Sequence, residues 1–137
     1  MLLRTTVMVL GLTILAAACT GSGVPPEAQP GAERWLALID AGRYAESWTE
    51  AAVYFKGAID SATWVKSLNA VRAPLGDLKT RTLKSAKAAT SLPGAPDGEY
   101  VVFQFDTAFA QKGNAVETVT VTHEKDGAWR ASGYFIK

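Results

Sequence analysis

An α+β domain is the fold class that this sequence predicts: an N-terminal helical hairpin and a third helix packed on a curved antiparallel meander sheet of about four strands. Between residues 33 and 71, apolar side chains recur every three or four residues, which is the period of an amphipathic helix. From residue 78 onward, apolar and polar residues alternate, which is the period of a half-buried strand. Because helical content precedes sheet content instead of alternating with it, the pattern favours α+β over α/β.

The chain of 137 residues is long enough for one domain. It has 14 basic and 13 acidic side chains, so that without Arg4 in the leader the balance is 13 to 13. This neutral charge and the lack of recognition motifs give no reason to expect nucleic acid as a partner. A single cysteine, Cys19, and a single histidine, His123, exclude an internal disulfide, a Cys/His zinc site and a Cys-His nucleophile pair. We therefore expect no cofactor and no metal.

Residues 1–18 have the layout of a secretory signal peptide. Arg4 precedes an apolar run at residues 7–15, and three alanines stand directly before Cys19. The apolar run is shorter than the ~20 residues that a membrane-spanning helix needs. The segment Leu15-Ala-Ala-Ala-Cys19 also resembles the lipobox of bacterial lipoproteins, although its leucine stands four residues before the cysteine where the pattern usually has three.

The resemblance to a lipobox implies that Cys19 receives a diacylglycerol and becomes the N-terminus of a membrane-anchored protein that carries palmitate or a similar acyl chain. Two alternatives are cleavage by ordinary signal peptidase after Ala18 and an uncleaved leader that acts as a weak anchor. A lone thiol directly after the small residues favours lipidation, because a free thiol is a liability in an oxidising compartment. The expected location is the bacterial cell envelope, and Thr20 after the cysteine favours the outer membrane or a periplasm-facing position by analogy with known lipoproteins.

Residues 19–31 contain three prolines and three glycines, and we expect a flexible tether there. Residues 32–137 then form the single domain. Its first expected helix covers residues 33–41, where Trp35, Leu38 and Ile39 share a face and Gly42 can end the helix.

The second expected helix covers residues 43–56, and its apolar stripe consists of Tyr44, Trp48, Ala51, Ala52 and Phe55. Since only the short connection Ala41-Gly42-Arg43 joins it to the first helix, the two should form an antiparallel hairpin. A third helix begins at Asp60 or Ser61, presents Trp64, Leu68 and Val71, and ends before Pro74.

Three tryptophans, Trp35, Trp48 and Trp64, lie in these apolar stripes, and core anchoring explains them better than a binding cage does. Arg72 follows the stripe of the third helix and has two interpretations. It could bind an anion in a cleft, or its stem could cover the core edge while the guanidinium satisfies carbonyls at the helix end. The second interpretation is the favoured one.

The sheet half begins with residues 78–88, which are rich in lysine. They resemble an edge strand whose lysine charges prevent pairing with the strands of other molecules. Residues 98–109 follow, with Val101, Phe103 and Phe105 on one face. After a five-residue connection at 110–114 come strands at 115–124 and 129–136, which are joined by the hairpin signal Asp126-Gly127.

A two-residue turn at Asp126-Gly127 predicts that His123 pairs with Arg130 and Val119 with Tyr134. Pairing Phe105 with Val119 gives a single apolar face, on which the helices should pack. The residues expected on the opposite, outer face are Tyr100, Gln104, Asp106, Thr118, Thr120, Thr122, Trp129, Ala131 and Phe135. Solvated threonines explain most of this face, whereas the aromatic residues Tyr100, Trp129 and Phe135 suggest a surface for a protein partner or a second copy.

Several motifs together resemble the bacterial family known as domain of unknown function 4019. The most specific are Pro96-Asp-Gly-Glu-Tyr100 and Trp129-Arg-x-x-Gly-Tyr134, and the resemblance covers residues 34–137. It implies no catalytic residues. The order of elements is also similar, more weakly, to the nuclear transport factor 2-like or cystatin-like superfold, whose members include enzymes and non-enzymatic pockets.

Two classes of function follow. The first is a non-catalytic binding or structural module tethered to the membrane by Cys19. The alternative is a small acid-base enzyme or small-ligand-binding protein with a cone-shaped cavity, lined by Arg72, Glu117, His123 and Tyr134. In that cavity Glu117 and Tyr134 share the inner face, whereas a lone His123 at a hairpin end is usually a solvated surface residue.

Overall fold

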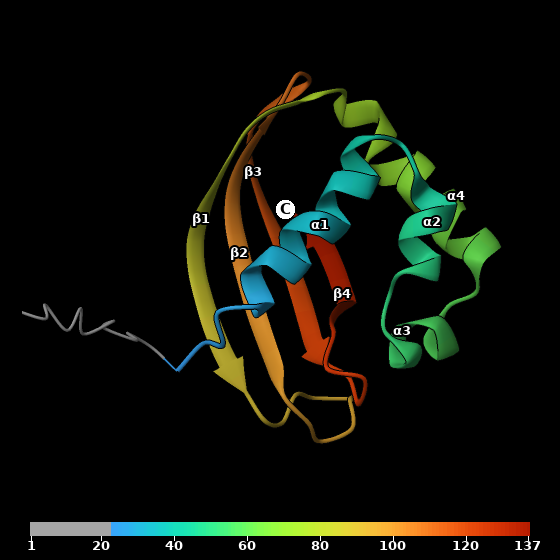
Figure 1. Ribbon diagram of the computed structural model, residues 1–137. Coiled ribbons are helices and arrows are strands. Elements are labelled where there is room, and N and C mark those ends of the chain that lie inside the picture. The colour runs from blue at the N-terminus through green and yellow to red at the C-terminus, as the bar shows by residue number, and fades with distance from the viewer. Residues whose placement is uncertain (1–22) are drawn as a thin grey trace, which may run out of the picture.

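The computed structural model describes residues 23–137, so that the predicted signal peptide and Cys19 lie outside the described residues. Four helices and a short 3-10 turn precede four strands (Figure 1). The helices are α1 (Ala28–Asp40), α2 (Tyr44–Thr49), α3 (Val53–Ala58) and α4 (Ser61–Val71), followed by the turn η1 (Ala73–Leu75). The strands are β1 (Leu78–Ala89), β2 (Tyr100–Phe109), β3 (Lys112–His123) and β4 (Trp129–Ile136).

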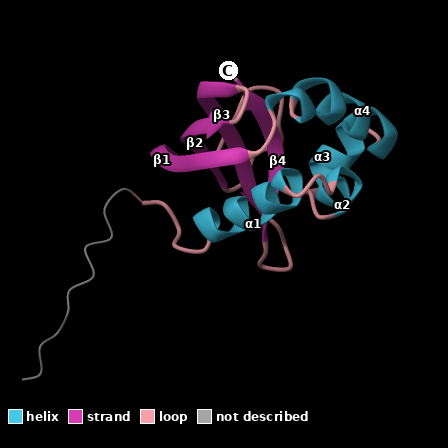
Figure 2. Ribbon diagram, turned by 90° about the horizontal axis from the view of Figure 1, so that it is seen from above, coloured by secondary structure: helices cyan, strands magenta, loops and turns pink. Residues whose placement is uncertain are grey.

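The strands form one antiparallel sheet in the order β1-β2-β3-β4, which is the predicted meander. Figure 2 shows the helices gathered on one side of this sheet. The core lies between the two layers and includes Val101 and Phe103 from β2, Val119 from β3, and Trp35 and Leu36 from α1. The α+β class, the strand order and the apolar inner face are therefore confirmed.

The prediction of one continuous second helix is wrong, because the chain forms α2 and α3 with a break between them. Ala52 is extended, and its N–H donates to the carbonyl of Ala131 in β4 at 2.8 Å. The N–H of Val53, at the start of α3, donates to the carboxylate of Glu124 at 3.0 Å. A helix running through this point would lose both contacts, since its own carbonyls would take these N–H groups.

The first helix begins at Ala28, so the last residues of the expected tether, 28–31, belong to the folded domain. Ala28 and Ala32 are fully buried, and Gly31 lies against Trp129 of β4. At its other end α1 stops as predicted at Gly42, whose φ is 75°. The N–H groups of Gly42 and Arg43 donate to Ile39 and Leu38, which is a Schellman motif.

We expect the substitution Gly31→Ala to lower the free energy of unfolding by about 1–3 kcal/mol, because it overpacks this contact. A Cβ atom at Gly31 would lie 2.9 Å from the carbonyl oxygen of Trp129 and 3.0 Å from its Cβ. The matched control is Gly57→Ala in α3, where a Cβ meets no atom within 4 Å. The control should be neutral or should stabilise by up to about 1 kcal/mol through helix propensity. Urea unfolding of both variants tests the prediction, and equal effects would contradict it.

All three tryptophans that were predicted to be core anchors donate their indole N–H groups to other residues of the helical layer, and two of them bind one buried serine. The indole N–H of Trp35 donates to the carbonyl of Ser47 at 2.7 Å, and that of Trp64 donates to the Ser47 hydroxyl at 3.0 Å. Trp48 donates to the carbonyl of Ile59 at 2.7 Å. Trp35 and Trp64 are stacked with ring centroids 5.9 Å apart. These satisfied N–H groups confirm the interpretation of the tryptophans as packing residues.

Both predicted turns in the meander need correction. The connection between β2 and β3 is shorter than the expected five residues, because Phe109 pairs with Lys112 across residues 110–111. As a result, Phe105 pairs with Glu117 and not with Val119, a shift of two residues that leaves the faces unchanged. Between β3 and β4, the backbone of Glu124 accepts from Gly127 and donates to Ala128, so the turn has three residues and not two.

A bulge in β4 then changes which side chains face the core. Thr120 pairs with Gly133 but Val121 pairs with Ala131, so that Ser132 is the extra residue. Beyond it, His123 lies opposite Trp129 where the sequence predicted Arg130. Trp129 and Ala131 are consequently buried in the core, and their prediction as outer-face residues is wrong.

Of the three aromatic residues predicted for a partner surface, only one is accessible. Phe135 is 56% exposed, whereas Trp129 is 8% and Tyr100 is 4% exposed. Tyr100 is covered by the loop between β1 and β2, and its hydroxyl donates to the carbonyl of Pro96. Because Tyr100 and Trp129 are buried, the prediction that they belong to a partner surface is wrong. Of the three aromatic residues, only Phe135 is still a candidate for such a surface.

Candidate functional site

A cluster of charged and polar side chains lies buried between the helices and the sheet. Every strand and two of the helix ends contribute to it. Its members are Asp40 at the end of α1, Arg72 after α4, Arg81 in β1, Thr107 in β2, Glu117 in β3 and Tyr134 in β4. We call these six residues the buried polar cluster.

Arg81 is the centre of the cluster because it binds both carboxylates. Its Nε donates to Oε1 of Glu117 at 2.7 Å, and its Nη1 and Nη2 donate to the two oxygens of Asp40 at 2.7 and 2.9 Å. The Glu117 side chain is completely buried, and that of Arg81 is 13% exposed. Buried charges need this kind of pairing, since an unpaired one carries a large desolvation cost.

Arg72, directly after the end of α4, is the second arginine of the buried polar cluster. Its Nη1 donates to the carbonyl of Gly76 at 2.6 Å, and its Nη2 lies 3.3 Å from Asp40. The guanidinium also sits over the ring of Phe109, 4.3 Å from the centroid. The carbonyl contact at the helix end agrees with the favoured interpretation of Arg72, and the ion pair with Asp40 was not foreseen.

Two hydroxyl groups complete the contacts of Glu117. Thr107 donates to Oε1 at 2.7 Å, and the hydroxyl of Tyr134 donates to Oε2. Burial, followed by the charge of Glu117 and the hydrogen bond to it, raises the pKa of Tyr134 well above its usual range. Tyr134 is therefore a neutral donor, and it cannot serve as a proton acceptor near neutral pH.

The structure brings together three of the four residues that the sequence suggested for a cavity, but inside the protein and not around an open space. Glu117 is 0% and Arg72 is 3% exposed. Tyr134 contacts Trp35 at 5.5 Å between ring centroids, so aromatic rings occupy the space between sheet and helices. His123 and Tyr134 line two different surface hollows. The arrangement is that of a packed core with an ionic network, in which only Nε of Arg72, among the cluster's buried polar side-chain atoms, lacks a hydrogen-bond partner.

His123 lies at the far end of the sheet from the other three residues. Its ring stacks on Trp129 with centroids 4.7 Å apart, and its Nδ1 contacts the carboxylate of Glu99. Both Glu99 and His123 are partly exposed to solvent. This position agrees with the interpretation of His123 as a surface residue at a hairpin end.

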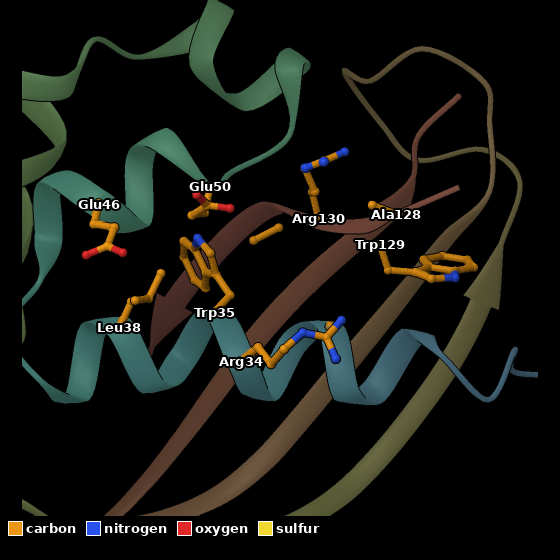
Figure 3. Close-up of a pocket in the computed structure, with 10 residues that line it drawn as sticks. Arg34, Trp35, Leu38, Glu46, Glu50, Ala128, Trp129 and Arg130 are labelled. Atoms are coloured by element: carbon orange, nitrogen blue, oxygen red, sulfur yellow. The ribbon is translucent and has the colours of Figure 1, made fainter. Parts of the chain in front are cut away.

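An accessible hollow of about 380 Å³ lies between α1, α2 and the start of β4 (Figure 3). We call it the α1–α2 groove. Trp35 and Leu38 of α1 and Ala131 of β4 supply its apolar lining. Its charged lining residues are Arg34, Glu46, Glu50 and Arg130. Figure 3 shows Glu46 at one end, Arg34 and Arg130 toward the other, and Glu50 beside the Trp35 ring between them.

The two ends of the α1–α2 groove differ in how firmly their charges are held. Arg130 is fixed by Glu124 at 2.9 Å and by Asp126 at 2.8 Å, and the hydrogen bond from Arg130 lowers the pKa of Asp126 to about 2. Glu46 pairs with Arg43 on its own helix. Arg34 and Glu50 take part in no ion pair with any residue of 23–137. These two charges are therefore available to a ligand.

Sequence reasoning missed Asp40, Arg81 and Thr107 in the buried polar cluster and Arg34, Glu46 and Glu50 in the α1–α2 groove. Asp40 had a signal that could have been used, because it lies four residues after Leu36 and next to Ile39 on the buried face of α1, whereas Arg81 lies in a lysine-rich strand and had none. The groove residues had none, since helix surfaces commonly carry such charges.

Within residues 23–137, no group of three or more His, Cys, Asp or Glu side chains is placed to hold a metal ion. No helix in the part of the chain that the structure describes is long and apolar enough to cross a membrane. A family model described as a protein of unknown function, DUF4019, matches residues 31–134. The match covers the helices after the first turn of α1 and nearly the whole sheet, and it confirms the resemblance. No curated protein matches the chain.

Proposed function

The chain belongs to the DUF4019 family of proteins of unknown function, and from that premise we propose that it is a bacterial envelope lipoprotein whose folded domain is a non-catalytic binding module. The anchor is Cys19, which stands directly after the small residues of the leader. The ligand site is the α1–α2 groove. Its occupant carries both signs of charge and an apolar part, to match Arg34 on the α1 side, Glu50 on the α2 side and the Trp35 ring.

The observation that carries this proposal is the contrast between the interior and the surface. The titratable groups of the interior, above all Glu117 and Arg81, already bind one another and lack an open space in which a substrate could meet them. Arg34 and Glu50 instead flank an accessible hollow and have no ion-pair partner in the described part of the chain. This favours surface recognition over the alternative of acid-base chemistry in a cone-shaped cavity.

Palmitate labelling tests the anchor. We expect the full-length protein, expressed in a bacterium with its own leader, to incorporate labelled palmitate and to fractionate with membranes. The variant Cys19→Ala should lose the label completely, because no other cysteine exists in the chain. Incorporation at the same level in both proteins, or in neither, would contradict lipidation.

Site-specific photo-cross-linking in living cells tests the groove. A benzophenone amino acid at Leu38, which lines the groove, should capture a ligand as a defined mass increase. The same amino acid at Thr82, which is exposed on β1, is the control and should give no such adduct. The substitution Arg34→Glu should weaken capture at Leu38, since it reverses the charge at one end of the groove. An equally strong adduct at Thr82, or an adduct at Leu38 that Arg34→Glu does not weaken, would contradict the proposed binding site.

A further inference from the structure

The position of residue 23 limits how far the domain can stand from a lipid-anchored Cys19. Residues 20–22 are the only ones between Cys19 and Gly23, and an extended chain spans at most ~3.6 Å per residue. The distance from the anchor to Gly23 is then no more than about 14 Å. Val24, the next residue, already packs against the core. With a lipid anchor on Cys19, the domain is therefore close to the membrane. The inference below rests on this part of the proposed function.

Gly23 lies at one particular end of the sheet. Gly23 and Pro25 line a hollow together with Ala89 at the end of β1 and Tyr100 at the start of β2. The loop between β1 and β2 (residues 90–99) and the turn between β3 and β4 (residues 124–128) lie at the same end, as Figure 1 shows. The turn between β2 and β3 lies at the opposite end, about 33 Å away along the ten residues of β2. Because the link between Cys19 and Gly23 is short, the end of the sheet beside Gly23 is the one nearest to the bilayer.

This end carries an exposed apolar patch. Val53 and Tyr54 at the start of α3 are 70% and 41% exposed. The hydroxyl of Tyr54 donates to the carbonyl of Gly94, which joins α3 to the loop between β1 and β2. That loop is itself uncharged from Ser91 to Pro96. We call Val53, Tyr54 and residues 92–96 the α3–loop patch.

The charges around the patch indicate which membrane surface it fits. The hollow beside it, of about 490 Å³, is lined by Asp97, Glu124 and Asp126 as well as by Lys125 and Arg130. Three acidic and two basic side chains leave a slight negative excess, so anionic lipids would not attract this end. Tyrosine is suited to the boundary between head groups and acyl chains, because its ring is apolar and its hydroxyl is polar, and the Tyr54 hydroxyl keeps a polar partner in the carbonyl of Gly94.

We propose that the α3–loop patch is a membrane-contacting surface, which rests on the head-group region of zwitterionic lipids while the β2–β3 turn points away from the bilayer. The contact is weak by itself, since two exposed side chains and a short loop bury little area, and the Cys19 anchor makes it intramolecular. Lipid contact is consequently expected only for the anchored protein, and it should change little with salt.

Energy transfer to labelled lipid tests this orientation. The full chain is expressed with its own leader, purified from membranes and reconstituted in phosphatidylethanolamine–phosphatidylcholine vesicles that contain an acceptor lipid. A donor dye is attached to Pro93→Cys in the loop or, as the matched control, to Gln111→Cys in the opposite turn. We expect clearly higher transfer from position 93, because position 111 lies about 30 Å farther from the surface. The double variant Val53→Asp/Tyr54→Asp should lower the transfer from position 93.

Equal transfer from both positions, or higher transfer from position 111, would overturn the proposed orientation. Transfer from position 93 that is unaffected by Val53→Asp/Tyr54→Asp would overturn the patch as the contact. Palmitate incorporation is measured on the same preparations. A labelled protein that fails the energy-transfer test refutes this inference alone, whereas a protein without label refutes the anchor and, with it, the inference.

Discussion

Replacing Arg81 with methionine is expected to lower the free energy of unfolding by about 3–5 kcal/mol, as for other buried ion pairs that lose one partner. Arg81 supplies charged donors to Glu117, which is completely buried, and to Asp40, whose side chain is 19% exposed. Methionine fills a similar volume but leaves both carboxylates without this partner. Arg72 still lies 3.3 Å from Asp40, so Asp40 keeps one charged partner. The loss of free energy therefore comes mainly from the unpaired, buried charge of Glu117. Urea unfolding at neutral pH measures the effect.

Lys84→Met is the matched control, because it removes a positive charge from the same strand at an exposed position. Lys84 lies 4.0 Å from Asp106, and both side chains are at least half exposed, so its loss should change the free energy of unfolding by less than about 1 kcal/mol. The double variant Arg81→Met/Glu117→Leu should recover part of the loss from Arg81→Met alone, since it removes the stranded carboxylate. A loss from Arg81→Met no larger than that from Lys84→Met would show that the buried polar cluster contributes nothing to stability.

The fold could be predicted from the sequence because its two halves follow different hydrophobic periods. The alternation of Val101, Phe103 and Phe105 is enough to identify the inner face of β2. The break between α2 and α3 could not be predicted in this way, since the helical period continues through Ala52 and Phe55. What breaks the helix is a tertiary contact, the hydrogen bond from Ala52 to Ala131, and local propensity carries no information about it.

The bulge in β4 shows the same limit in the sheet. Counting residues back from Asp126-Gly127 gives the correct pairing of Val119 with Tyr134 and of Glu117 with Ile136. The three-residue turn shifts the pairing of β3 and β4 by one residue, and the extra residue Ser132 shifts it back. Between the turn and Ser132, the β4 side chains therefore point to the opposite face from the predicted one. Trp129 therefore enters the core, where it packs on Gly31, and this contact gives a reason for the exchange.

The candidate sites were less predictable than the fold. Glu117 and Tyr134 were correctly placed together on the inner face, because both belong to strands whose register was nearly right. Their partner Arg81 lies in a lysine-rich edge strand, where a basic residue looks like solvent-facing protection. Its inward direction depends on the pairing of Arg81 with Thr107, which only the three-dimensional register shows.

Removing the Trp35 ring by substitution with alanine is expected to lower the free energy of unfolding by about 3–5 kcal/mol, the range for large aromatic side chains in a core. Trp35 is 3% exposed and contacts the rings of Trp64, Phe55 and Tyr134. Its indole N–H also satisfies the carbonyl of Ser47 at 2.7 Å, which the alanine variant leaves without this donor. Thermal and urea unfolding measure the loss.

Phe135→Ala is the control, because it removes an aromatic ring that is 56% exposed and should cost less than about 1 kcal/mol. Trp35→Ala also tests whether the space between sheet and helices is filled in the native protein. If it is filled, the variant gains an apolar cavity and binds a small neutral probe such as benzene, whereas the wild-type protein does not. If instead the wild-type protein binds benzene as strongly as the variant does, the interior is already open, and the case for surface recognition over chemistry in a cone-shaped cavity loses its basis.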